Sequence, residues 1–145
     1  MKAKDLMIGD WVLCDNNAQS DYEFDNVNYR PFQILNGNDI DYAFERNMIG
    51  DADVYQPVPL TADILEGNGF KKHDFEHIEG QHKWSWWRDT GTLVSLWCRE
   101  LGDNPGDGWM VRIESPDATC CRRVESVHEL QHALRLCGVE KEIIL

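Results

Sequence analysis

Two histidines and a glutamate near the C-terminus are the residues whose types and spacing could carry out chemistry. His128, Glu129 and His132 spell H-E-x-x-H. In zinc peptidases, two imidazoles on one helical face hold the metal, and the glutamate is the general base for the metal-bound water. Because a five-letter pattern also occurs by chance, the surrounding sequence must supply the rest of such a site.

A zinc peptidase needs a third protein ligand, and the sequence does not place one. The longer form of the motif requires glycine and histidine where this chain has Arg135 and Gly138. The acidic residues Glu140 and Glu142 lie beyond the expected end of the helix. The spacing of the upstream histidines recommends none of them as a ligand: His73, His77 and His82.

The helical pattern over residues 126–138 indicates a structural element instead. At 100° per residue, its apolar side chains form one stripe: Val127, Leu130, Ala133, Leu134 and Cys137. The two histidines project from the opposite side, which we expect to be solvated. Ser126 and Glu129 have the spacing of a capping box, and Gly138 ends the helix. We therefore interpret the H-E-x-x-H string as coincidental and expect no catalytic residue, no metal and no cofactor.

Length and composition predict a folded chain without a membrane anchor. The 145 residues, of which 42% are hydrophobic, suit one ordinary domain or two very small ones. The apolar run at residues 6–8 ends at Gly9 and Asp10, so we expect no signal peptide. No apolar segment approaches the ~18 residues of a membrane-spanning helix. The five cysteines lack C-x-x-C spacing, which favours reduced thiols and a cytoplasmic location.

The formal charge of −12 excludes some partners. A duplex or an anionic membrane repels such a chain, so we expect neither direct nucleic-acid binding nor membrane binding. The acidity is spread along the sequence and serves solubility. Alternatively, it forms a surface that imitates nucleic acid or docks on a basic partner protein.

Alternating strands and turns predict a small β-rich unit over residues 1–58. A Gly-Asp turn starts the first strand, an Asn36-Gly37 hairpin precedes the third, and a proline favours a sheet edge for the fourth. The four expected strands cover residues 6–13, 29–35, 40–44 and 54–58. Such a set suits an SH3-like β-barrel or a curled sheet.

A connector helix at about residues 61–67 is predicted to lead into an α+β unit that covers residues 59–145. Thr61 is its N-cap, and glycines end it after about two turns. The C-terminal helix should cover the apolar face of an antiparallel sheet, so the whole chain is α+β. The expected strands of this sheet are residues 82–88, 92–99 and 109–113.

Five tryptophans fall on these strands and are the candidate ligand- or partner-binding residues: Trp84, Trp86, Trp87, Trp97 and Trp109. They either fill a core or form a stacking platform for a sugar, a base or a partner side chain. Neighbouring residues of a strand point to opposite faces. At least one of the adjacent indoles of Trp86 and Trp87 is therefore expected outside the core.

Three stretches resemble a family of small uncharacterised proteins found in gut bacteria and in their phages and mobile elements. The resemblance covers both ends and the connector, but neither the loop 15–28 nor the Trp-rich middle. It implies no known activity, cofactor or catalytic residue. Similar proteins often carry Gln or Asn at the positions of Glu129 and His132, as a structural motif allows. The matching stretches are Asp5–Val12, Tyr55–Phe70 and Ser126–His132.

These observations favour a non-enzymatic, cytoplasmic module of phage or mobile-element origin that binds another protein. The alternative is a small-ligand binder whose tryptophan cluster stacks on a nucleotide or a sugar. Antagonism of host defence is a variant of either hypothesis. A zinc metallopeptidase is the least favoured reading.

Overall fold

The computed structural model describes residues 6–15, 29–34, 36–48, 55–74, 81–99 and 108–145. The chain divides into two compact units, residues 1–58 and 59–144. Each unit has its own antiparallel sheet and at least one helix, so the predicted α+β class is confirmed. Among the described residues, no helix is long and apolar enough to cross a membrane.

The first unit contains a three-stranded sheet in the order β2-β1-β3. The expected Gly-Asp turn leads into β1: Gly9 has a φ of 93°, and Asp10 Oδ2 accepts a hydrogen bond from Met7 N at 2.7 Å. Gly9 N donates to Ile34 O at 2.7 Å, which holds the end of β2 beside this turn. Strand β3 ends in proline and lies at a sheet edge, where prolines are tolerated. The strands are β1 (Trp11–Asp15), β2 (Tyr29–Gln33) and β3 (Tyr55–Pro57).

The strand expected at residues 40–44 is wrong, because this segment lies in helix α1 (Gly37–Met48). Asn36 caps the helix: its Oδ1 accepts from Asn38 N at 2.8 Å, and its N–H donates to Asp39 Oδ2 at 3.2 Å. This reciprocal cap competes with the hairpin turn that Asn-Gly otherwise favours. The described strands of the unit form an open sheet, so they do not close the expected SH3-like barrel. Among the described residues of the unit, one buried cluster contains Leu6, Val12, Ile34, Ala43 and Tyr55.

The second unit is a five-stranded antiparallel sheet in which each strand pairs with the next along the chain. Its three middle strands match the expected ones closely. The two edge strands were not predicted, because KKHD and TCCRRV contain few apolar residues. The strands are β4 (Lys71–Asp74), β5 (Gln81–Arg88), β6 (Thr92–Arg99), β7 (Trp109–Glu114) and β8 (Thr119–Val124).

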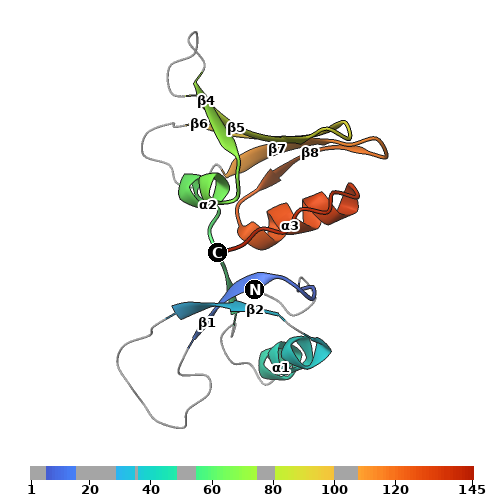
Figure 1. The fold of residues 1–145 in the computed structure, drawn as a ribbon. Helices are drawn as coiled ribbons and strands as arrows, with labels where there is room; N and C mark the ends of the chain where they lie inside the picture. The colour runs from blue at the N-terminus through green and yellow to red at the C-terminus, as the bar shows by residue number, and fades with distance from the viewer. Residues whose placement is uncertain (1–5, 16–28, 35, 49–54, 75–80, 100–107) are drawn as a thin grey trace. The chain divides into compact units, whose positions relative to one another are not determined.

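Both helices of the second unit lie on one side of its sheet (Figure 1). Helix α2 (Ala62–Gly67) is the expected connector, and Thr61 Oγ1 accepts from Ile64 N at 3.3 Å as its N-cap. Helix α3 (Val127–Leu136) is the expected C-terminal helix, and Gly138 follows it with a φ of 67°. Both helix predictions are confirmed.

The side of the sheet that faces these helices, here called the inner face, forms the core. Its strand residues include Val94, Leu96, Val111, Ile113 and Val124, all fully buried. The predicted stripe of α3 packs on this side and is also buried, from Val127 to Cys137. Each such side chain contributes about 1.5–3 kcal/mol when removed from water. The inner face is therefore the structural side of the sheet, and the opposite side, the outer face, is left for other roles.

Candidate binding surface

Two residues of the H-E-x-x-H string, His128 and Glu129, make hydrogen bonds at the start of α3. Glu129 Oε2 accepts from Glu125 N at 2.6 Å and from Ser126 N at 3.3 Å, which is the carboxylate half of the predicted capping box. The Ser126 hydroxyl is hydrogen-bonded with His128 Nδ1 at 2.8 Å. The rings of His128 and His132 are 5.6 Å apart and nearly perpendicular. Among the described residues, no three His, Cys, Asp or Glu side chains could together hold a metal ion.

The expectation that both histidines are solvated is wrong for His128, which is only 8% exposed. A helical wheel assumes that a helix is covered along one stripe, whereas the chain after α3 returns along a second side. Gln131 is buried there: its Nε2 donates to Lys141 O at 2.9 Å, and its Oε1 accepts from Ile143 N at 2.8 Å. The side-chain amide of Gln131 thus forms hydrogen bonds with the backbone of the C-terminal segment, as a neighbouring strand would.

Cys137, directly after α3, does not have the character of a nucleophile. Burial, assisted by the neighbouring Cys120, raises the pKa of the Cys137 thiol. A raised pKa keeps the thiol protonated at neutral pH, whereas a nucleophilic cysteine needs a lowered one. Cys137 is the last residue of the apolar stripe of α3, and its role is to pack in the core.

Two of the five candidate tryptophans belong to the inner core. The rings of Trp84 and Trp109 meet edge to face at 5.2 Å. Trp84 Nε1 donates to Glu66 Oε1 at 3.0 Å, and Trp109 Nε1 donates to Leu60 O at 2.8 Å. These bonds fasten α2 and the segment before it to the sheet. Both indoles are at most 9% exposed, so neither offers a ring face to a ligand.

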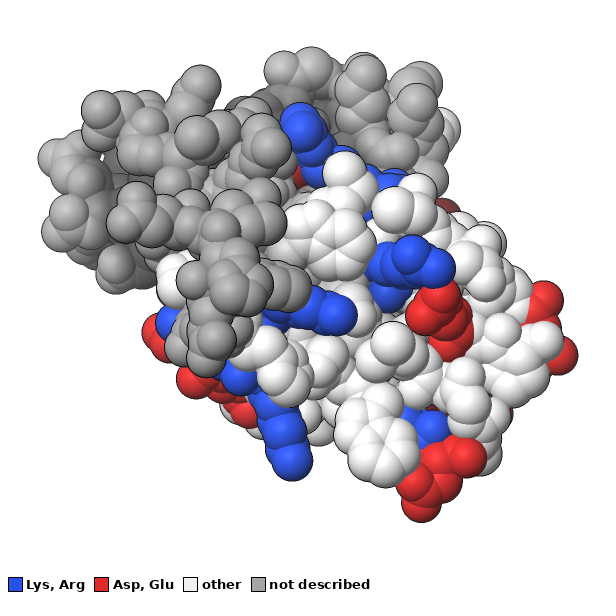
Figure 2. All heavy atoms as spheres, turned by 90° about the horizontal axis from the view of Figure 1, so that it is seen from above, with Lys and Arg blue, Asp and Glu red and all other residues white. Residues whose placement is uncertain are grey.

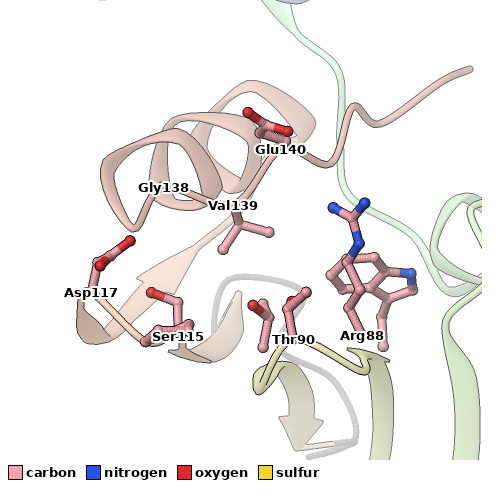
Figure 3. Close-up of a pocket in the computed structure, with 10 residues that line it drawn as sticks. Arg88, Thr90, Ser115, Asp117, Gly138, Val139 and Glu140 are labelled. Carbon is pink, nitrogen blue, oxygen red and sulfur yellow. The ribbon is translucent and has the colours of Figure 1, made fainter.

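Trp86 also lies on the inner face but is only partly buried. Lys141 Nζ lies 4.9 Å from the centre of its ring and 5.6 Å from that of Phe70. Burial lowers the pKa of Lys141. Trp86 lines one wall of a hollow of about 180 Å³ between two strand turns and the residues after α3. Figure 3 shows polar side chains around this hollow: Arg88, Thr90, Ser115, Asp117 and Glu140.

Trp87 and Trp97 lie on the outer face. Directly paired residues of an antiparallel sheet point to the same side. The register therefore arranges the described side chains of the outer face in three rows across the strands. The Trp87 row is Trp87, Leu93, Glu114 and Thr119. The Arg112 row is Lys71, Ser85, Ser95, Arg112 and Cys121. The Trp97 row is His73, Lys83, Trp97, Met110 and Arg123.

The outer face is aromatic and basic, although the chain is acidic. The indole of Trp87 is 64% exposed. The side chains of Trp97 and of its neighbour Met110 are partly exposed. The three rows hold one acidic side chain, Glu114, which is paired with Arg112. Figure 2 looks onto this side and shows basic residues across its described part, with acidic residues mainly towards the margins. The basic side chains of the rows are Lys71, Lys83, Arg112 and Arg123.

Comparison with protein-family models, curated proteins and solved structures finds no match. The functional assignment therefore rests on the geometry of the chain itself.

Sequence reasoning found the two outer tryptophans but missed the cations around them. A net charge taken over the whole chain conceals a basic face. The strands that carry Lys71 and Arg123 were also not recognised, so no pairing could bring these residues to Trp97. The alternation of Lys83, Ser85 and Trp87 along β5 was the available signal.

Proposed function

We propose that the protein is a non-enzymatic module that binds another protein on the outer face of its five-stranded sheet. The observation that carries this proposal is the 64% exposed indole of Trp87 on a paired strand. Tryptophan, methionine and arginine are enriched in protein interfaces, and tryptophan and arginine dominate their binding energy. Trp87, Met110 and Arg112 bring these residue types together on one side of a rigid sheet.

One pairing on this face has the form of a nucleophile and a base. His73 Nε2 and Ser85 Oγ are 2.7 Å apart. Ser85 lies on β5, which is hydrogen-bonded to strands on both sides. Stabilisation of an oxyanion is effective in a preorganised site from which water is excluded. The His73–Ser85 contact is instead exposed to solvent, so we assign no hydrolytic role to the pair.

Two further features support a cytoplasmic setting and a mobile-element origin for this module. Three cysteines of the second unit are free thiols, Cys120, Cys121 and Cys137, which supports a cytoplasmic location. The resemblance of the two ends and the connector to proteins of gut bacteria and their phages supports a phage or mobile-element origin.

Site-specific photo-cross-linking in host cells tests the docking surface. A photoreactive phenylalanine analogue at position 87 should give a defined protein adduct, whereas the same residue at position 136 should not. Leu136 is a matched control because it is apolar and 75% exposed on α3. The cross-linked partner, once purified, should lose affinity for Trp87→Ala but not for Leu136→Ala. Equal adducts from both positions, or equal affinities, would contradict the proposal.

A second function, small-ligand binding, is favoured by the hollow beside Trp86 (Figure 3). Its volume of about 180 Å³ is below the 300–1,000 Å³ of typical ligand pockets, so only a phosphate group or one sugar ring fits. Titration of a nucleotide and sugar panel should then shift tryptophan fluorescence in the wild type and not in Arg88→Ala. An unchanged spectrum across the panel would remove this candidate.

A further inference from the structure

We propose that the outer face recognises an extended protein segment in which an acidic residue stands between two apolar residues, in the order apolar–x–acidic–x–apolar. This inference rests on the proposed function and specifies the partner at the same surface. It follows from the order of the three rows. The Trp87 and Trp97 rows each contain an apolar cross-strand pair, whereas the Arg112 row between them has cations and no apolar pair.

The Trp87 and Trp97 rows each contain one apolar cross-strand pair. Trp87 lies opposite Leu93, and Trp97 lies opposite Met110. Aromatic and aliphatic side chains in such pairs form continuous apolar surface. Because Trp87 is the most exposed of the four, we infer that the Trp87 row is the main anchor.

In the Arg112 row between them, two serines are flanked by one cation on each side. Ser85 and Ser95 occupy the two middle strands, and Ser95 is only 4% exposed. The serines therefore form a low strip between the larger side chains of the neighbouring rows. Lys71 lies on one side of this strip and Arg112 on the other. The side chain of Arg112 is 55% exposed and has donors beyond its contact with Glu114.

The rows have the spacing of alternate residues in an extended peptide. Successive rows are two residues apart along each strand, which is about 6.7 Å. A segment that lies along the strands presents residues i, i+2 and i+4 at the same spacing. If residue i packs on the Trp87 row and residue i+4 on the Trp97 row, residue i+2 lies over the serines. A carboxylate there reaches Arg112, and a charge-assisted bidentate bond forms.

The charge of the chain favours a protein segment over single-stranded nucleic acid as the occupant of this face. Exposed indoles and cations also bind single-stranded nucleic acid, where successive bases stack on aromatic rings. Here the two outer indoles are four residues apart along the strands, about 13 Å, with serines between them. The charge of −12 opposes a polyanion more strongly than a short segment with one or two carboxylates. The observations therefore favour the protein segment.

A displayed library of random 12-residue peptides, selected on the full chain and counter-selected on Trp87→Ala, tests the pattern. We expect the enriched peptides to share apolar–x–Asp/Glu–x–apolar. A synthetic peptide from this set should bind about tenfold more weakly when its central carboxylate is replaced by the amide, as for loss of a charged hydrogen bond. Its affinity for the wild type should also fall as salt rises.

Two adjacent arginines of β8 provide a matched pair of variants. Arg122 and Arg123 are both exposed, but they point to opposite faces of the sheet, and Arg123 belongs to the Trp97 row. Arg123→Glu should weaken the peptide at least several-fold, whereas Arg122→Glu, with the same change in charge, should leave its affinity unchanged. Circular dichroism melting establishes that both variants fold. Equal effects of the two substitutions would overturn the proposal.

The remaining outcomes separate this inference from the function on which it rests. Peptides that require Trp87 but lack the central acid would overturn the pattern and leave the docking surface standing. A library without any Trp87-dependent peptide would count against the docking surface itself. A 12-residue oligothymidylate that binds as tightly as the best peptide, and is weakened by Arg123→Glu, would replace the protein segment by single-stranded nucleic acid.

Discussion

At Glu129 the catalytic and the capping roles exclude each other. Its Oε2 accepts hydrogen bonds from the N–H groups of Glu125 and Ser126, at the N-terminus of its own helix. A general base must instead direct its lone pairs to a water on the metal. The side chain that completes the motif in the sequence is therefore occupied in the fold.

Glu129→Gln tests this assignment. The amide oxygen retains an acceptor for the cap, so we expect a loss of at most about 1 kcal/mol in the free energy of unfolding, measured in urea. Dialysed wild-type protein should contain well under one zinc per chain by atomic emission. One tightly held zinc, lost together with a proteolytic activity in His132→Ala, would refute the structural reading.

The lowered pKa of Lys141 leads us to expect that the stability of the fold depends on pH. Burial lowers its pKa, so the folded state disfavours the charged amine. Below the folded pKa the amine is charged in both states, and the penalty is complete. The penalty is relieved as pH rises from the folded pKa towards the unfolded value near 10.4. The unfolding free energy of the wild type should therefore rise relative to Lys141→Met over this alkaline range. A difference that does not change with pH would contradict the assignment.

At the scale of elements, α1 and the chain after α3 each depend on one polar side chain. Asn36 and Asp39 exchange hydrogen bonds at the start of α1. Gln131 binds the backbone at Lys141 and Ile143 and so holds the C-terminal segment along α3. Short apolar patterns are ambiguous in both places, so these polar contacts decide the local structure.

Asn36→Ala should destabilise α1 by about 1 kcal/mol, as is usual for the loss of a helix N-cap. Hydrogen exchange of the amides at residues 40–44 should become faster, while exchange in α3 stays unchanged. Asn36→Asp keeps a capping oxygen and serves as the control. Unchanged exchange at residues 40–44 in Asn36→Ala would contradict the assignment of Asn36 as the cap of α1.

Gln131→Leu should cost about 1–3 kcal/mol of unfolding free energy. The change keeps the volume of the side chain but removes the acceptor of Ile143 N, whose residue is 1% exposed. Leu136→Ala, an exposed site on the same helix, should stay within about 0.5 kcal/mol of the wild type. Similar costs for both variants in urea would show that the Gln131 bridge does not stabilise the fold.

At the scale of the whole molecule, the division after Val58 separates two sheets with separate cores. The start of the second unit is anchored within that unit. Leu60 N donates to Glu125 O at 3.1 Å, and Leu60 O accepts from Trp109 Nε1 at 2.8 Å. A chain that begins at residue 59 keeps both contacts.

The fragment 59–145 is therefore expected to fold alone. It should unfold cooperatively in urea, with a tryptophan emission maximum as blue-shifted as that of the full chain after allowance for Trp11. Trp84→Ala, which removes a buried indole, should abolish or strongly lower this transition. A gradual fluorescence change without a transition in the unmodified fragment would show that the second unit needs the first.

The sequence by itself determined the elements whose signals are local. Thr61 with Gly67, and Ser126 with Gly138, mark the ends of α2 and α3, because caps and stops involve residues within one or two helical turns. The middle strands and the α+β class follow from apolar periodicity in the same way. The alternation along β5 also sufficed to separate Trp86 from Trp87.

The tertiary structure alone decided which residues face which partner. Ile40 and Phe44 fit a strand as well as a helix, and the cap at Asn36 together with burial of Ala43 selected the helix. His128 became buried although the wheel placed it in solvent. The basic outer face exists only because strand pairing brings Lys83 and Arg123 into one row with Trp97. Register is a property of distant segments, and no local pattern in this chain contains it.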